Sequence, residues 1–589
     1  MPFAAMHRSL GLVAERANSG IAEVAYQGHP NPMGSMLIVV AVVGAVALTE
    51  RSTEHLPFAI AALLCNAALL LIFVADFDRA ILLSGIVAIT IAGASTVKFD
   101  HSALKLTISD LPLVFAGTVP FLVLQYPRVM LGVLVSIVLF VAASIAVLLY
   151  AAGPPMSLAL RLLLFNVAVI GFAAAAATKD AIAPSRLALT QRRSFYSTFM
   201  ASLVDRVCWR QFGGLALSDI ANEPLPLKEA TPARSDASPD IIIIQHESVF
   251  DPRILGLPVE PIVEGLLSPA NGQYGRLNVD IFGGGSWQSE FSLLTGLSSA
   301  SFGSSAYYLF KKGAGRFHSS LPRSLASLGY RTTLISSCRR SFLSYDRFYS
   351  SIGIHERVFI EDLPPPFDAR RFEATNSDAI FLEAVIDAHT KSVINHPAPH
   401  FLYVLTNFNH GPHDRQLVPA GQFEKERTFA AASLPDAGYA EYYTRLVETA
   451  STWQKLKRRL ANRFPGRPML IVHYGDHQPV LTGRIAHRLK CRGDARDAFT
   501  TFYAIEALNM SRTPFGSGRG PDLDIAFLGT VALQHAGLPL DPVFSTRASL
   551  LDDCREAYFG SGSERKRQFH RTLVDLGLID LVPNVPRAR

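Results

Sequence analysis

The sequence predicts an α-helical multi-span membrane anchor followed by an α/β domain with a central, mostly parallel sheet. Two observations lead to this fold class. Of the 589 residues, 49% are hydrophobic and the mean hydropathy is +0.24, and the apolar excess is concentrated in roughly the first 180 residues. From residue 239 onward, short aliphatic runs alternate with helical patterns. Strands buried on both faces of a parallel sheet and joined by helices give this pattern.

The predicted anchor occupies residues 34–178 and follows an N-terminal tail, residues 1–33, which lacks the continuous apolar core of a signal peptide. A helix needs about 20 apolar residues to cross a bilayer. Six runs approach this length: 36–48, 57–75, 80–95, 111–126, 129–150 and 158–177. The run at 111–126 contains two prolines and the last run contains Arg161. We therefore expect five or six spans.

The soluble part begins after a boundary. Residues 179–238 are charged and then rich in proline, alanine and serine, which predicts a juxtamembrane helix and a linker. Residues 239–589 are long enough for one large catalytic domain. Within it, strands are expected at 240–246, 331–337, 401–406, 469–474 and 524–529, and amphipathic helices at 319–330 and 376–389.

Charge and cysteine content limit the choice of partners. The formal net charge is +6, and no lysine or arginine block resembles a nucleic-acid-binding arm. We therefore expect no nucleic acid, and an anionic lipid surface is the more natural partner. Cys65 lies inside an apolar run. The other four cysteines, Cys208, Cys338, Cys491 and Cys554, fit either two disulfides or free thiols, and the sequence leaves both open.

Acidic and histidine side chains follow several of the predicted strands, where ligands bind in open α/β sheets. Glu247 follows the first strand, His410 follows the strand at 401–406, and Asp476 and His477 follow the strand at 469–474. Carboxylate with imidazole is a ligand set of zinc or manganese. We predict one divalent metal, Mn²⁺ or Zn²⁺ in preference to Mg²⁺, held by Glu247, Asp476 and His477 and lowering the pKa of a coordinated Ser286 hydroxyl.

Ser286 follows three glycines, residues 283–285, that allow close approach of a phosphate to the backbone. Ser289 is the second choice of nucleophile. Taken singly, each motif also has an ordinary explanation: the glycines as a flexible turn, and Asp-His after a strand as a surface turn. Their joint occurrence at successive strand ends is what favours a metal-dependent site.

Four motifs in order, "HES", a glycine-rich segment with serine before "SEF", "NHGP" and "YGDH", resemble the alkaline phosphatase/sulfatase superfamily over roughly residues 238–530. Within it, the chain is similar to the membrane-anchored branch: lipoteichoic acid synthases, phosphoglycerol transferases and phosphoethanolamine transferases. The resemblance implies a sulfatase-like fold and a metal set of Glu247, Ser286, Asp476 and His477. It gives Ser286 the place of the nucleophile, usually threonine, and His410 contact with the substrate or leaving group.

The sequence also departs from the family in two places. A sulfatase signature, Cys or Ser opening a C/S-x-P-x-R segment, is absent because Ser286 is followed by Trp-Gln-Ser, which argues against sulfate esters. Where lipoteichoic acid synthases carry a tryptophan and an arginine, this chain has Leu343 and Tyr345. Neighbouring arginines can supply the charge instead. The expected substrate-binding residues are Arg339, Arg340, Asn407 and His413.

The resemblance implies a phosphotransferase that moves a phosphoglycerol or phosphoethanolamine head group from a membrane phospholipid to a glycan or glycolipid through a covalent serine intermediate. It implies a multi-pass protein of the bacterial inner membrane whose catalytic domain is extracytoplasmic, facing the periplasm or cell exterior. Two alternatives stay open at this stage. One is a phosphodiester hydrolase of the same superfamily, and the other is a catalytically degenerate membrane receptor.

Overall fold

The computed structural model describes residues 32–581, except 103–104, 112–126, 152, 154, 178–191, 206–208, 210–213, 218–219, 235–237, 368–376, 490–494, 511–514 and 555–562. The chain forms two compact units. The first comprises Met1–Val97, Pro120–Ala183 and Arg192–Val204, and the second comprises Lys98–Val119, Pro184–Gln191 and Asp205–Arg589. Residues 98–119, which the sequence analysis assigned to the anchor, thus group with the second unit.

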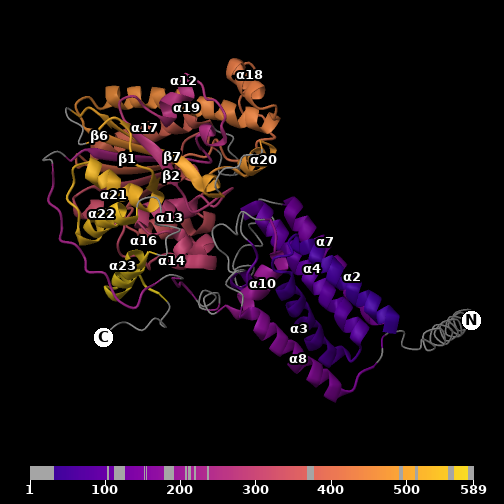
Figure 1. Ribbon diagram of the computed structural model, residues 1–589. Coiled ribbons are helices and arrows are strands. Elements are labelled where there is room, and N and C mark those ends of the chain that lie inside the picture. Colours follow the sequence, from indigo (N-terminus) through magenta and orange to yellow (C-terminus); the bar gives the residue numbers. More distant parts are fainter. Residues whose placement is uncertain are drawn as a thin grey trace, which may run out of the picture. The chain divides into compact units, whose positions relative to one another are not determined.

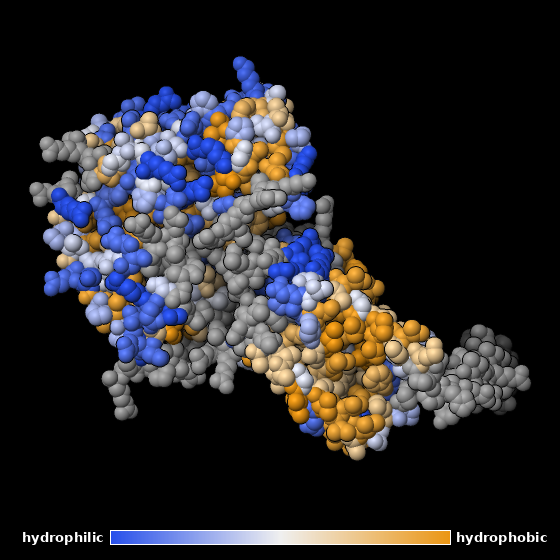
Figure 2. All heavy atoms as spheres, in the orientation of Figure 1, coloured by the Kyte–Doolittle hydropathy of each residue, from blue (hydrophilic) through white to orange (hydrophobic). Residues whose placement is uncertain are grey.

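The first unit is helical (Figure 1). Its elements are α2 (Pro32–Glu50), α3 (Leu56–Val74), α4 (Phe77–Ser102, whose last residues group with the second unit), α7 (Pro127–Tyr150), α8 (Leu158–Ala176) and α10 (Phe195–Val204). Five helices of the described chain are long and apolar enough to cross a membrane: Met33–Glu50, Leu56–Val74, Phe77–Asp100, Met130–Tyr150 and Leu158–Ala176. Figure 2 shows hydrophobic side chains covering much of this unit's visible surface.

The predicted spans are largely confirmed. Five of them correspond to helices, while the run at 111–126 lies outside the described residues apart from Leu111. Arg161 does not interrupt its helix, because its Nη1 donates a hydrogen bond of 2.6 Å to the carbonyl oxygen of Ile72 on α3. A cation within an apolar helix is tolerated where a backbone oxygen accepts a hydrogen bond from it. The predicted N-terminal tail lies outside the described residues.

The second unit is built on a nine-stranded sheet in the order β4-β3-β5-β1-β6-β7-β2-β8, with β9 also paired to β2. The strands are β1 (Asp240–His246), β2 (Gln273–Asn278), β3 (Arg331–Ser336), β4 (Glu356–Val358), β5 (His400–Leu405), β6 (Met469–Gly475), β7 (Thr500–Leu508), β8 (Gly518–Arg519) and β9 (Leu523–Asp524). Strands β4, β3, β5, β1 and β6 are parallel, whereas β7 runs antiparallel to both β6 and β2. The α/β fold class with a mostly parallel sheet is therefore confirmed.

Helices cover both faces of the sheet (Figure 1). Ile242 and Ile244 of β1 enter a core shared with α12 (Pro261–Leu267), α17 (Asp378–Asn395) and α19 (Ala437–Arg463). Ile241 and Ile243 point the other way, because successive side chains of a strand alternate. Their core is shared with α13 (Trp287–Thr295), α21 (Ile525–His535), α22 (Pro542–Cys554) and α23 (Glu564–Asp575). A strand buried on both faces explains the run of four isoleucines.

Shorter helical elements complete the second unit. They are η1 (Ile108–Asp110), η4 (Pro252–Leu255), η5 (Ser299–Tyr308), α14 (Leu309–Gly313), α15 (Leu321–Ser327), η6 (Phe342–Ser344), α16 (Tyr345–Ser351), η7 (Ile360–Asp362), α18 (Glu424–Ser433), α20 (Val480–Arg488) and η8 (Ala495–Phe499). The predicted helices at 319–330 and 376–389 are confirmed as α15 and α17. Among the described cysteines, Cys65 and Cys338 are free thiols.

Four predicted strands are confirmed within one residue at either end, and the fifth is wrong. At 524–529 only Asp524 belongs to a strand, and Ile525–His535 is helix α21. Nearly every residue of this helix is buried, from Ile525 through Leu533. A helix that is apolar all round gives the same continuous apolar run as a buried strand, and only length separates the two. The antiparallel strand β7 was not predicted.

Gly475, the last residue of β6, gives a test of this packing. A Cβ atom at this position would lie 1.7 Å from the carbonyl oxygen of Val249. We expect Gly475→Ala to lower the Tm of the second unit by about 10 °C, because the backbone must shift. The three tryptophans, Trp209, Trp287 and Trp453, all lie in this unit, so their fluorescence in a thermal scan reports its unfolding.

Gly265→Ala is the matched control, because the atom nearest to its added Cβ is the mobile Gln454 side chain at 3.4 Å. In helix α12 alanine is favoured over glycine by about 1 kcal/mol. The control should therefore keep or slightly raise the Tm. Equal Tm values for the two variants would contradict the close packing at Gly475.

Candidate active site

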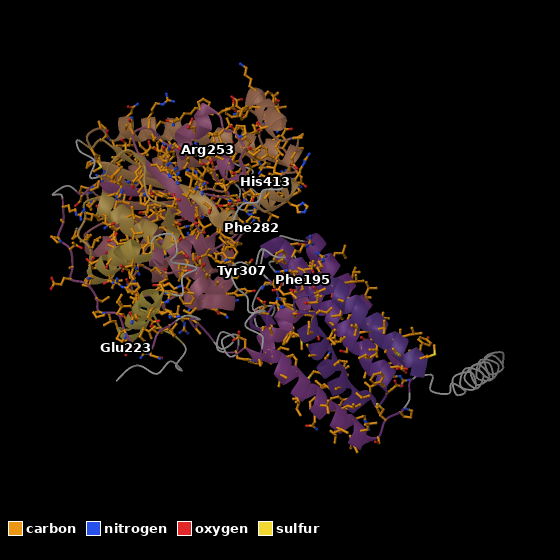
Figure 3. The ribbon with its side chains drawn as sticks, in the orientation of Figure 1. Phe195, Glu223, Arg253, Phe282, Tyr307 and His413 are labelled. Atoms are coloured by element: carbon orange, nitrogen blue, oxygen red, sulfur yellow. The ribbon has the colours of Figure 1, made fainter. Side chains whose placement is uncertain are left out.

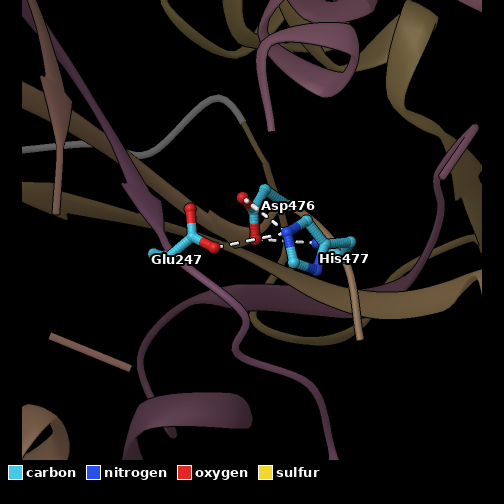
Figure 4. A group of neighbouring side chains, drawn as sticks. All are labelled: Glu247, Asp476 and His477. Carbon is cyan, nitrogen blue, oxygen red and sulfur yellow. Dashed lines mark hydrogen bonds and ion pairs between the residues drawn. The ribbon is translucent and has the colours of Figure 1, made fainter. Parts of the chain in front are cut away.

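Three side chains predicted as metal ligands meet at the carboxyl edge of the parallel strands. Glu247 directly follows β1, and Asp476 and His477 directly follow β6. Because β1 and β6 are parallel neighbours with His246 opposite Gly475, the next residues of both strands emerge side by side. One ligand atom from each of the three residues lies within 4.8 Å of the others, and all three residues are buried (Figure 4).

Ser286 joins this group from the amino end of α13. Its Oγ donates a hydrogen bond of 2.7 Å to Oε2 of Glu247 and lies 3.4 Å from Nε2 of His477. The side chain is half-buried, whereas the acids beside it are buried. Ser286 is thus the member of the group that an incoming substrate can reach, and it lies at a helix amino terminus, which favours negative charge.

The glycines before Ser286 are required by the backbone. Gly283, Gly284 and Gly285 have φ values of 77°, 146° and 93°, a region that side chains other than hydrogen rarely allow. The Gly283 N–H also donates a hydrogen bond of 2.8 Å to the carbonyl oxygen of Gln478. The turn therefore ties the segment that carries Ser286 to the segment that carries His477.

Ser289 is placed differently. It is fully buried, and its hydroxyl donates a hydrogen bond of 2.6 Å to the carbonyl oxygen of Asp476. This position supports the Asp476–His477 turn and leaves no access for a substrate. Ser286 is the better placed nucleophile of the two.

Sequence reasoning missed Ser248, which aligns both carboxylates. Its N–H donates to Oδ1 of Asp476 at 2.7 Å, and its hydroxyl donates to Oε1 of Glu247 at 2.9 Å. Its φ is 56°, in the left-handed region that a serine seldom adopts. Strain of this kind collects where neighbouring groups must be held in place. The polar residue after the acid in "HES" was the available signal.

The group fits a divalent cation. Burial and the neighbouring Glu247 carboxylate raise the pKa of Asp476 well above its ordinary value. Burial would raise the pKa of Glu247 too, but the charge of His477 holds it well below its ordinary value. Oδ2 of Asp476 is buried without a hydrogen-bond partner among the described residues. Two buried carboxylates and one imidazole, with an oxygen unsatisfied, form a donor set that suits zinc or manganese.

The loop after β5 brings His410 toward the group but not His413. The charge of His410 contributes to lowering the pKa of Glu247, and Nδ1 of His410 lies 2.6 Å from the carbonyl oxygen of Gly411. Since a carbonyl only accepts, Nδ1 donates this hydrogen bond, and Nε2 is left for a substrate. His413 is buried, with Nε2 bonded to the carbonyl oxygen of Asn409 at 3.0 Å. Asn407 begins this loop and is half-buried.

Arg445, a second residue that the sequence analysis missed, holds this loop from α19. Its buried guanidinium donates to the carbonyl oxygens of His410 at 2.9 Å and Arg415 at 2.7 Å. Glu441, one helical turn earlier, accepts from Nε of Arg445 at 2.8 Å. Burial lowers the pKa of Arg445 despite the favourable carboxylate. No local pattern marks a long-range contact of this kind.

The two arginines after β3 are not equivalent. Arg340 pairs with Asp346 at 3.1 Å and Asp362 at 2.6 Å, and its guanidinium lies 4.7 Å from the centre of the Phe359 ring. Arg339 is half-buried, and its Nε has no hydrogen-bond partner among the described residues. Arg340 therefore braces the loop, whereas Arg339 keeps an unused donor at Nε.

A buried hydrogen-bond network underlies these segments. Glu290, one turn after Ser286, accepts from Gln245 Nε2 at 3.2 Å, from the Tyr345 hydroxyl at 3.2 Å and from the Tyr349 hydroxyl. Burial raises the pKa of Glu290 to about 7. The amide oxygen of Gln245 in turn accepts from the hydroxyls of Tyr474 at 2.5 Å and Tyr403 at 3.3 Å. Strands β1, β5 and β6 are thereby linked to α13 and α16.

The chain is similar to known proteins over part of its length. Residues 239–504 match the Sulfatase family model. An uncharacterized protein of Haemophilus influenzae is 24% identical over 323 residues, 53% of this chain and 56% of that protein. The capsular polysaccharide biosynthesis protein RkpI of Rhizobium meliloti is 27% identical over 311 residues, 52% of each chain. The chain thus spans about half the length of the curated relatives it matches.

Among solved structures, part of this chain is similar to the Streptococcus pyogenes phosphoglycerol transferase GacH in complex with sn-glycerol-1-phosphate. The TM-score is 0.45 at 17% identity, and the match covers 59% of this chain and 86% of that one.

Metal binding tests the ligand group. We expect one equivalent of Mn²⁺ or Zn²⁺ to bind the full chain, measured by titration calorimetry and by metal analysis. Asp476→Asn should weaken binding by more than about 100-fold, because even residues that only orient a ligand contribute about 10–100-fold. Asp522→Asn, which alters an ion pair with the exposed Arg519, is the matched control. Equal affinity in the two variants would rule out Asp476 as a ligand.

Glu290 predicts a pH dependence of stability. Its folded-state pKa of about 7 lies above the ordinary 4.5, so the fold favours the protonated acid. Protonated Glu290 contributes about 3 kcal/mol to the free energy of unfolding. This contribution is complete below pH 4.5 and is lost as the pH rises through 7. Denaturant titrations followed by tryptophan fluorescence should show a shallower decline with pH for Glu290→Gln than for the unaltered chain.

The exposed Glu229 offers the matched control for this comparison, because Glu229→Gln makes the same chemical change at the surface. Its pH dependence should match that of the unaltered chain. An unchanged decline in Glu290→Gln would show that Glu290 is ionised throughout this range.

Proposed function

We propose, from the match of residues 239–504 to the Sulfatase family model, that the chain is a metal-dependent phosphotransferase acting on a phospholipid head group. The observation that carries the proposal is the reachable Ser286 hydroxyl, 2.7 Å from Glu247 in the buried group with Asp476 and His477. A serine in this setting is an activated nucleophile for phosphorus. Because the sulfatase signature is absent, we propose phosphate esters and not sulfate esters as substrates.

Glu247, Asp476, His477 and Ser286 would hold the cation, Mn²⁺ or Zn²⁺. When bound, it lowers the pKa of the serine hydroxyl and stabilises negative charge on the phosphate. The chain's own residues complete the site. Arg339 binds the phosphate oxygens, since a guanidinium matches them with two parallel donors. Asn407 and His410 line the side of the leaving group, and the turn at residues 283–285 lets the phosphate approach the backbone.

The reaction proceeds in two displacements. Ser286 Oγ gives its proton to the Glu247 carboxylate that it is hydrogen-bonded to and forms a bond to phosphorus, and the bond from phosphorus to the diacylglycerol oxygen breaks. His410 donates its Nε2 proton to that oxygen, so diacylglycerol leaves as the alcohol. An acceptor hydroxyl then gives its proton to His410 and attacks phosphorus, and Ser286 leaves and takes its proton back from Glu247. Each displacement replaces one ester oxygen by another, as covalent catalysis requires.

Donor and acceptor follow from the rest of the chain and from its relatives. The five apolar helices would confine the enzyme to the membrane that contains its lipid donor. We propose the bacterial inner membrane, with the catalytic domain facing the periplasm or cell exterior. One curated relative is named a capsular polysaccharide biosynthesis protein, which supports a surface glycan or glycolipid as acceptor. Phosphoglycerol and phosphoethanolamine are the two proposed head groups.

Trapping the intermediate tests the proposal. The full chain in detergent is incubated with Mn²⁺ or Zn²⁺ and, separately, with phosphatidylglycerol or phosphatidylethanolamine. Peptide mass spectrometry should find a head-group phosphate ester on the peptide containing Ser286, and its mass names the donor. Ser286→Ala should abolish the adduct, whereas Ser286→Thr keeps a hydroxyl at the same place and should restore it.

The outcomes separate the alternatives. Cleavage of a soluble phosphodiester that depends on Ser286, without an adduct from either lipid, would assign a hydrolase. A chain that binds no metal, forms no adduct and cleaves no ester would be a receptor built on the same fold. An adduct that persists in Ser286→Ala would move the nucleophile to another residue.

A further inference from the structure

A short segment between two of the apolar helices belongs to the catalytic unit. Residues 98–119, which include the last residues of α4 and all of η1, group with residues 205–589. We call residues 105–111, the described part around η1, the interhelix strap. Asp110 organises it: Oδ2 accepts from the N–H of Thr107 at 2.7 Å and from its hydroxyl at 3.1 Å, and Oδ1 accepts from Lys98 Nζ at 2.7 Å. Lys105, Thr107 and Asp110 are buried.

The strap is bound to η5 through Tyr308. The Tyr308 hydroxyl donates a hydrogen bond of 3.0 Å to Oδ1 of Asp110. Burial and the Asp110 carboxylate both raise the pKa of Tyr308 above its ordinary value, so the phenol stays protonated and can donate. A hydrogen bond to a charged acceptor is stronger than one between neutral groups. Asp110 therefore holds Tyr308 firmly.

From Tyr308 the contacts continue to the nucleophile. The carbonyl oxygen of Tyr307 accepts from Trp287 Nε1 at 2.7 Å, and the two rings meet edge to face at 4.8 Å. Trp287 directly follows Ser286 and also meets the ring of Phe342 at 5.8 Å. Phe342 lies in the segment that carries Arg339. Figure 3 labels Tyr307 on η5 and Phe282, which precedes the glycine turn.

We propose that the interhelix strap is a positioning element of the catalytic site, with Asp110 as a positioning residue that acts through Tyr308, Tyr307 and Trp287 on Ser286. Trp287 contacts Tyr307 of η5 on one side and Phe342, in the segment that carries Arg339, on the other. A shift of η5 therefore moves the nucleophile relative to Arg339. Reacting groups displaced by about 1 Å can lose about 100-fold in rate. This role rests on the proposed function for its catalytic readout, but its structural readout does not.

The test compares Tyr308→Phe, Asp110→Asn and the double variant in the full chain. Tyr308→Phe removes one hydroxyl and keeps the ring. Tyr330→Phe is the matched control: its hydroxyl donates a hydrogen bond of 2.8 Å to the carbonyl oxygen of Pro239, before β1 and at the opposite edge of the sheet. For each variant, head-group transfer to Ser286 is timed with lipid donor, metal content is measured, and hydrogen exchange is followed in peptides covering residues 281–297 and 337–344.

We expect each strap variant to slow transfer about tenfold at saturating donor, the effect of one strong hydrogen bond. KM and metal content should change less than about twofold, since neither the lipid contacts nor the ligands are altered. The double variant should be no slower than the slower single variant, because both changes break the same contact. Exchange should quicken in both peptides, and Tyr330→Phe should leave rate and exchange in these peptides unchanged.

Transfer within twofold of the unaltered chain, with unchanged exchange at 281–297, would overturn the positioning role. So would an equal loss in Tyr330→Phe, which would mark a general effect on stability. If the unaltered chain transfers no head group, the proposed function fails, and the exchange measurement still decides whether Asp110 holds the nucleophile segment.

Discussion

A single buried carboxylate holds the candidate site together. Glu290 lies where ionisation is costly, and a polar group buried in this way is tolerated only when it is hydrogen-bonded. Its three donors come from β1 and α16, and Gln245 extends the network to β5 and β6. The strands and helices that carry or directly precede the site residues are thus joined to this network, each at a position a few residues from its site residue. The position of one acid fixes the spacing of the others.

The group of Glu247, Asp476 and His477 differs in character from the network around Glu290. Glu247 and Asp476 are brought together in a buried pocket that opposes their joint ionisation, and Ser248 holds them there with two hydrogen bonds. Such a pair of carboxylates attracts positive charge, as His477 shows. Burial alone would lower the pKa of His477, but Asp476 and Glu247 raise this pKa to about 9. The network around Glu290 fixes the distances between these segments, and the group of Glu247, Asp476 and His477 attracts a cation. Only the network around Glu290 and the group of Glu247, Asp476 and His477 together make a site in which a serine hydroxyl can be activated.

Much of this arrangement could be predicted from sequence, because it depends on local patterns. Aliphatic runs identified β1, β3, β5 and β6, and the polar residues after them identified Glu247, Asp476 and His477. Ser286 was marked by its glycines. What could not be predicted depends on partners far away in sequence: Arg445 reaches back to His410, and Asp110 meets Tyr308 nearly two hundred residues later. The error at α21 has a different cause, because full burial removes the periodicity that separates helix from strand.

Arg445 holds the loop after β5 by donating hydrogen bonds to main-chain carbonyl oxygens, those of His410, Pro412 and Arg415. Because such contacts are indifferent to side-chain identity, the loop's path is specified separately from its chemistry. The exposed side chains of Asp414 and Gln416 take no part in these three contacts. Point changes at these positions can therefore alter the surface of the loop on an unaltered frame, without displacing His410.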